Sequence, residues 1–119
     1  FTPSEHLQHP YVMLGVNVVA AETDAEARFL ASSGRQSFAS LRAGRPMQLP
    51  PPSKEWERDP SDANDPTNAT RVSFVGAQAT VREQMHAFID RTQADELIAV
   101  SHIYDHRARL RSYELAATL

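Results

Sequence analysis

Several features are missing from this sequence, and each absence excludes a class of protein. The 119 residues include no cysteine, which excludes disulfide bonds, thiolate metal sites and cysteine nucleophiles and fits a reducing compartment. Fifteen acidic residues outnumber 12 basic ones, so the chain has no electrostatic footprint for nucleic acid. No apolar run approaches the ~20 residues that span a bilayer, and the N-terminus lacks the regions of a signal peptide. We therefore expect a cytoplasmic protein that binds neither nucleic acid nor membrane.

What is present is typical of one small globular domain. Hydrophobic residues make up 41% of the chain and charged residues 23%. The sequence begins with Phe1 instead of methionine, which predicts that something upstream is missing.

The first regular elements are a strand and a helix. Residues 11–21 are nearly continuous, β-branched and apolar, which predicts a strand buried on both faces. Asn17 interrupts it, either as an amide hydrogen-bonded in the core, the reading we favour, or as a side chain that points into a pocket. Thr23 and Glu26 form a capping box that begins a helix, and Gly44 ends it. Its apolar face comprises Ala27, Leu30, Ala31, Gly34, Phe38 and Leu41.

A polar, proline-rich excursion covers about residues 45–70. Such a long connection is either packed on a larger body or mobile, and Trp56 favours packing because a lone tryptophan commonly anchors a polar segment. Val75-Gly76 then predicts a turn into a second helix at about 78–92. A short buried strand is expected at 97–100, followed by a last helix at about 106–117 that buries Leu110, Tyr113 and Ala117.

The polar residues that follow the second strand are the first place to look for a ligand site. In parallel α/β folds ligands bind beyond the carboxyl ends of the strands, where Ser101, His102 and Tyr104 fall. His102 is either a proton donor or a hydrogen-bonded structural histidine, the second being favoured. Asp105 is expected to cap the last helix. The four-residue spacing of His102 and His106 is weak evidence for a metal, because the two rings need not converge, and we predict no metal site.

Several blocks of the sequence, in order, resemble one family. The segments 10–13 and 18–27, then Val75-Gly76 leading to Val81, then residues 94–97, and finally 101–106 with 110–114, are similar to the late-barrel segments of luciferase-like, flavin-dependent monooxygenases. The Gly-Arg-Pro segment at 44–52 is similar to the variable connection of that family. The resemblance covers almost the whole chain.

The resemblance implies an α/β fold that is the C-terminal portion of an eight-stranded (β/α)8 TIM barrel, with residues 1–119 supplying the last two strands and about three helices. Such a segment is incomplete on its own and pairs with the upstream barrel segment. The parent enzyme would use reduced FMN, delivered by a flavin reductase, and O2 to oxidise a small organic substrate. No catalytic residue of the family is carried over, and the segment alone is expected to be inactive and without cofactor. Barrel enzymes bind ligands at strand ends, so Asn17, Ser101, His102 and Tyr104 are expected to line the flavin or substrate pocket.

Two alternatives stay open. The chain is either a non-catalytic module that associates with itself through exposed strand edges, or part of a deazaflavin-dependent oxidoreductase with the same barrel architecture. A homo-oligomer is expected because an unsealed parallel sheet needs partners for its edges and faces.

Overall fold

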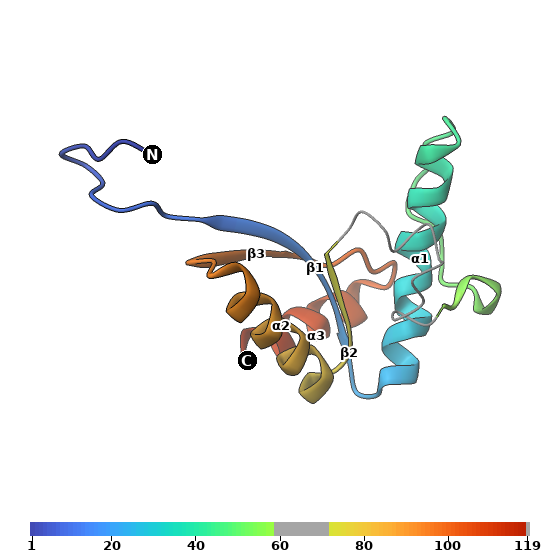
Figure 1. Ribbon diagram of the computed structural model, residues 1–119. Helices are drawn as coiled ribbons and strands as arrows, with labels where there is room; N and C mark the ends of the chain where they lie inside the picture. The colour runs from blue at the N-terminus through green and yellow to red at the C-terminus, as the bar shows by residue number, and fades with distance from the viewer. Residues whose placement is uncertain (59–71, 119) are drawn as a thin grey trace.

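The described part of the chain forms a three-stranded parallel sheet with three α-helices and one short 3-10 helix (Figure 1). The computed structural model describes residues 1–58 and 72–118. The elements follow the order β1 (Met13–Ala21), α1 (Asp24–Arg42), η1 (Lys54–Trp56), β2 (Ser73–Ala77), α2 (Gln78–Thr92), β3 (Glu96–Val100) and α3 (His106–Ala117).

One strand was not expected. The sequence predicted only a turn at Val75-Gly76, but these residues lie in β2, which pairs with the carboxyl half of β1 from Asn17↔Ser73 to Ala21↔Ala77. A five-residue strand after a polar segment leaves little alternation to detect. The prediction of two strands is therefore wrong for this segment, whereas the positions of the other two strands and of the three helices are confirmed.

The sheet has the order β2-β1-β3, with the longest strand in the centre. β3 pairs with the amino half of β1, from Met13↔Glu96 to Asn17↔Val100. Asn17 is therefore the one position of β1 that faces a neighbour on both sides, Ser73 and Val100. Both neighbours run parallel to β1, and each pairs with a different half of it.

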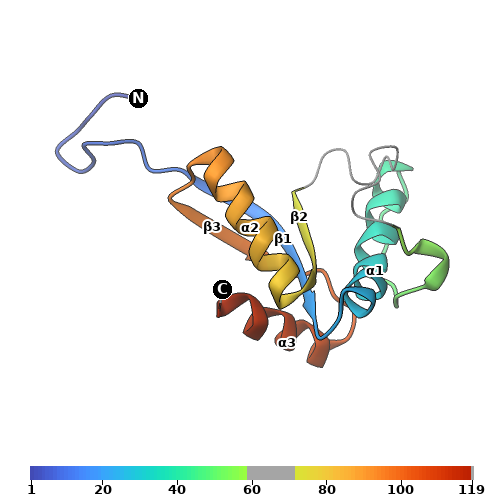
Figure 2. The same ribbon diagram turned by 60° about the horizontal axis from the view of Figure 1, so that its bottom comes forward.

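One face of the sheet is covered by α2 and α3, which lie side by side beneath it (Figures 1 and 2). The even-numbered residues of β1 point to these helices because successive side chains of a strand alternate between faces. The rings of Phe74 and Phe88 meet edge to face at a centroid distance of 5.6 Å. The buried residues of this core are Val16, Val18, Ala20, Phe74, Val81, Phe88 and Leu115.

Among the described residues, α1 covers the opposite face at the carboxyl ends of the strands. This second core joins the first turns of α1 to the ends of β1 and β2 and to one loop residue, Ile103, which is completely buried. Its buried residues are Val19, Ala21, Ala27, Leu30, Ala31, Val75 and Ile103.

The described residues leave the rest of that face exposed. Met13, Ile98 and Val100 are 47%, 49% and 41% exposed, and they share the face with Gly15 and Asn17. We call these five residues the open face. The sequence predicted a strand buried on both faces at 11–21 and a buried strand at 97–100. Both predictions are wrong for this part of the two strands, because the described residues cover only one face there. A parallel sheet normally has both faces covered.

Two of the predicted helix caps are confirmed. The Thr23 Oγ1 accepts a hydrogen bond from the Glu26 amide at 3.1 Å, and an Asp105 carboxylate oxygen accepts one from the Ala108 amide at 2.8 Å. Gly44 has a φ of +75°, the left-handed conformation that ends a helix and favours glycine.

The buried face of α3 differs from the prediction. Leu110 is 49% exposed and Tyr113 39% exposed, whereas Ser112 and Leu115 are buried. The apolar residues of this helix are few, so their spacing alone gave the wrong phase. The small hydroxyl of Ser112 packs where the helix comes closest to β1.

The beginning of the proline-rich excursion packs on α1. The Ser53 amide donates to the Ser32 hydroxyl at 2.9 Å, and the Gln36 side-chain amide donates to the Pro51 carbonyl at 3.0 Å. Trp56 is half-buried in η1. Residues 59–71 of the predicted excursion lie outside the described residues.

Helix α2 receives its N-terminal cap from another element. Residue 77 is an alanine and has no capping side chain. The Asp24 carboxylate, at the start of α1, instead accepts hydrogen bonds from the Ala77 amide at 2.7 Å and the Thr80 hydroxyl at 2.8 Å. These bonds, the amide first, lower the pKa of Asp24. One carboxylate therefore joins the N-termini of two helices.

This cap gives the fold a pH dependence. Because the pKa of Asp24 is lower in the folded chain than in the unfolded one, its contribution to stability is complete above about pH 4 and is lost as the pH falls through the folded value. We expect Asp24→Asn to lower the thermal midpoint at pH 7 and to reduce its decline between about pH 5 and pH 2. Circular dichroism melts measure both effects. The control is Asp90→Asn, at an exposed position of α2; an equal loss in both variants would contradict this role of Asp24.

Candidate functional site

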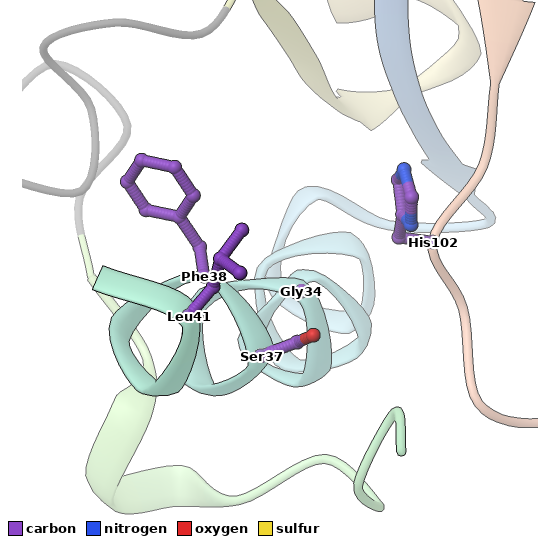
Figure 3. A pocket seen from close by; sticks show the side chains of 5 residues that line it. All are labelled: Gly34, Ser37, Phe38, Leu41 and His102. Atoms are coloured by element: carbon purple, nitrogen blue, oxygen red, sulfur yellow. The ribbon is translucent and has the colours of Figure 1, made fainter. Parts of the chain in front are cut away.

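A pocket of about 320 Å³ lies between α1 and the loop that follows β3. It is lined by Gly34, Ser37, Phe38, Leu41 and His102 (Figure 3). Phe38 and Leu41 project from α1 on one side, and His102 stands across from them. The pocket is at the carboxyl-end side of the sheet, where parallel α/β folds bind ligands.

The wall on the α1 side continues the apolar stripe that builds the core. The first part of this stripe, which includes Ala27 and Leu30, is buried against the sheet. The helix then extends beyond the sheet, so Phe38 is only half-buried and Leu41 is 59% exposed. The same periodicity therefore serves packing at one end of α1 and a pocket at the other.

His102 is held between two anchored neighbours. On one side, the Ser101 hydroxyl donates to the Val18 carbonyl at 2.6 Å, and the Ser101 amide donates to the Tyr113 hydroxyl at 3.0 Å. On the other side, Ile103 is fully buried in the core under α1. The backbone of His102 is thus fixed at both ends, while its side chain lines the pocket.

Ser101 has a structural partner in Ser112. β3 pairs with β1 only as far as Asn17. On this edge of β1, the backbone groups beyond Asn17 therefore need other partners. The Ala20 amide donates to the Ser112 hydroxyl at 2.9 Å, and the two serine hydroxyls are 3.2 Å apart. Two buried serines therefore replace a neighbouring strand along this edge.

The structure separates the four residues predicted to line a pocket. His102 lines the pocket described above, whereas Ser101 is buried behind the loop. Tyr104 is 54% exposed, and Asn17 is half-buried on the open face. Asn17 is the register partner of Val100, two residues before His102, and a joint role for all four residues stays a prediction.

Carboxylates lie at the N-termini of the three helices. Asp24 caps α2, Asp105 caps α3, and Asp24 and Glu26 lie in the first turn of α1. Positive ends of helix dipoles attract anions, but at these three ends the chain already supplies the anion or the hydroxyl. Among residues 1–58 and 72–118, no three His, Cys, Asp or Glu side chains come together as a possible metal site.

Comparison with known proteins finds relatives of this chain. A protein of Escherichia coli K12 named luciferase-like monooxygenase is 40% identical over 118 residues, which cover 98% of this chain and 35% of that protein. The uncharacterized protein YvbT of Bacillus subtilis is 36% identical over 119 residues, with the same two coverages. The crystal structure of apo-MsnO8 matches with a TM-score of 0.76 and 34% identity, covering 99% of this chain and 37% of that one. The chain is a homologue of the C-terminal segment of proteins named luciferase-like monooxygenase. It spans about a third of the length of these relatives, and no family model matches it.

The resemblance to luciferase-like monooxygenases that the sequence indicated is thus confirmed, but the pocket wall was missed. Gly34, Phe38 and Leu41 were assigned to the helix core because their spacing continues the buried stripe. The signal that separates these residues from the core is length, since a helix of 19 residues is about 28 Å long. It is longer than the five-residue carboxyl half of β1 on which it packs.

No helix in the described ranges is long and apolar enough to cross a membrane.

Gly34 offers a direct probe of this pocket. A methyl group at Gly34 would lie 3.5 Å from the Cβ of His102, which is an ordinary van der Waals contact. We expect Gly34→Ala to stabilise the chain by up to about 1 kcal/mol, because alanine is the better helix former, and to narrow the pocket. Urea unfolding measures the first effect, and a crystal structure of the variant the second. A destabilised variant would show that α1 and the loop lie closer together than described.

Proposed function

We propose that this chain is the C-terminal part of an FMN-dependent luciferase-like monooxygenase, which uses reduced flavin and O2 to oxidise a small organic substrate. The observation that carries the proposal is 40% identity, over 98% of the chain, to a protein with that family name. Because the chain spans only about a third of its relatives, the activity belongs to the longer protein. A separate flavin reductase would deliver the reduced cofactor to it.

The open face supports the barrel architecture of this proposal. In a β/α barrel the helices cover the outside and apolar side chains fill the inside. Here α2 and α3 cover one face. The part of the other face that α1 does not cover is apolar and exposed, at Met13, Ile98 and Val100. We assign the open face to the barrel interior and propose that the upstream strands and their side chains cover it.

The residues of the pocket fit one part of a flavin and not another. Phe38 and Leu41 offer an apolar wall for a flat ring, and the His102 imidazole offers a hydrogen-bonding group opposite that wall. The phosphate of FMN requires cations or uncapped amides, and the three helix N-termini of this chain are already capped or acidic. We therefore propose that earlier strands and loops of the longer protein hold most of the phosphate. Reduced flavin, when bound, supplies the electrons that activate O2.

The open face also favours a second candidate, the non-catalytic self-associating module. An apolar face that none of the described segments covers is a place where a second copy of the chain can pack. In this alternative the apolar side chains of the open face contact their counterparts in a homo-oligomer, and no cofactor is bound.

Flavin binding by a chimera distinguishes these candidates. Fusing the remaining two thirds of the Escherichia coli relative upstream of residues 1–119 supplies the missing length. We expect the chimera to quench FMN fluorescence and to consume O2 when reduced FMN is added, and the isolated chain to do neither. Binding of a deazaflavin instead of FMN would favour the alternative oxidoreductase. A folded chimera that binds neither cofactor would contradict both enzymatic proposals.

A further inference from the structure

We propose that Tyr113 is a positioning residue for His102: acting through the backbone of Ser101, its hydroxyl fixes the direction in which the imidazole enters the pocket. The identity of the pocket's ligand rests on the proposed function, whereas the contact between Tyr113 and Ser101 is observed.

The argument begins with the geometry of the loop. β3 ends at Val100, and the chain must leave the sheet to reach α3 at His106. Loops of this kind are mobile unless their backbone groups and side chains are held. Here the amide of Ser101 has a side-chain partner 12 residues away, because the Tyr113 hydroxyl lies 3.0 Å from it.

The second step is the surroundings of the tyrosine. Tyr113 is 39% exposed, so part of its ring lies at the surface, beside the fully buried Ser112. A phenol at this position places a polar tip at the end of an apolar ring, and the tip reaches the loop. Phenylalanine would fill the same volume without the hydroxyl, so the hydrogen bond is the property that tyrosine adds.

The third step is the consequence for the pocket. Ser101 and Ile103 fix the two flanks of His102, and Gly34 lies close on the side of α1, where a built Cβ would be 3.5 Å from the His102 Cβ. With its backbone held, the imidazole has few rotamers to choose from, and less entropy is lost when it binds a ligand. Release of the Ser101 amide would allow one flank to move.

The test is nuclear magnetic resonance on the full 119-residue chain with labelled histidines, comparing Tyr113→Phe with the wild type. We expect the Ser101 amide to exchange with solvent about five to ten times faster in the variant, as for one lost hydrogen bond. We also expect the His102 ring signals to shift or broaden, while those of His6, His9, His86 and His106 stay in place. The matched control is Tyr104→Phe, which removes the hydroxyl of an exposed tyrosine in the same loop and is expected to change neither signal.

Faster exchange at Ser101 with unchanged His102 signals would make Tyr113 a merely structural residue and overturn the proposal. An equal shift in the Tyr104 control would overturn it as well. If Tyr113→Phe does not fold, Tyr113→Leu removes the same hydroxyl and is expected to shift the His102 ring, and an unshifted ring contradicts the proposal. No flavin is present, so this result and the chimera experiment succeed or fail separately.

Discussion

Replacing Gly76 with alanine is expected to destabilise the chain by about 2–4 kcal/mol, from overpacking and backbone strain together. Gly76 has a φ of +157°, and a Cβ at this position would lie 2.7 Å from both the Asp24 carboxylate and the Thr80 side chain. The substitution therefore pushes apart the carboxylate and the helix it caps. Because small domains are stable by only about 5–15 kcal/mol, the loss is a large part of the total.

Gly15 provides the matched control for this substitution. It lies in the neighbouring strand β1 on the open face, and a Cβ there meets nothing within 4 Å. Gly15→Ala is expected to be neutral or slightly stabilising, since alanine restricts the unfolded chain more than glycine does. Urea unfolding of both variants is the measurement. Equal midpoints for the two variants would show that the Asp24 cap does not require the close approach at Gly76.

Truncating Ile103 to alanine is the second large expected effect. The side chain is fully buried between α1 and the ends of β1 and β2, so we expect a loss of about 2–5 kcal/mol from the lost burial and the cavity left behind. The same change also frees the flank of His102. Thermal unfolding measures the stability of the variant.

Leu110→Ala is the control for Ile103, because Leu110 is also a large aliphatic residue but is 49% exposed. Its expected cost is below about 1 kcal/mol. A reversed order, with Leu110 more costly than Ile103, would mean that α3 presents its other face to the sheet.

Elements with strong local signals could be predicted from the sequence. The Thr23 side-chain cap, the Asp105 cap and the stop at Gly44 each rest on chemistry within a few residues, and all three are present. The second helix lies at the predicted residues 78–92 because its apolar face repeats regularly.

Features that depend on distant residues could not be predicted. Asp24 caps α2 from 53 residues away, and Ser112 binds β1 from 92 residues away. The local sequence does not indicate such partners. The phase of α3 was wrong for the same reason, since its burial is decided by the serine that meets β1 and less by its apolar residues.

The candidate site shows the same division. His102 could be singled out because polar residues after a buried strand lie at the ligand-binding edge of a parallel sheet. The opposite wall could not, because Phe38 and Leu41 belong to a stripe whose first half is core. Where the helix outreaches the sheet is a property of the assembled fold.

The measurement that tests the account most directly is the thermal midpoint of Val100→Lys in two contexts, the isolated chain and the chimera. Val100 belongs to the open face and is 41% exposed here. If the rest of a barrel covers this face, the lysine buries an unpaired charge in the chimera and lowers its midpoint strongly. In the isolated chain the same lysine stays in water and leaves the midpoint nearly unchanged. An unchanged midpoint in the folded chimera would contradict the assignment of the open face to a barrel interior.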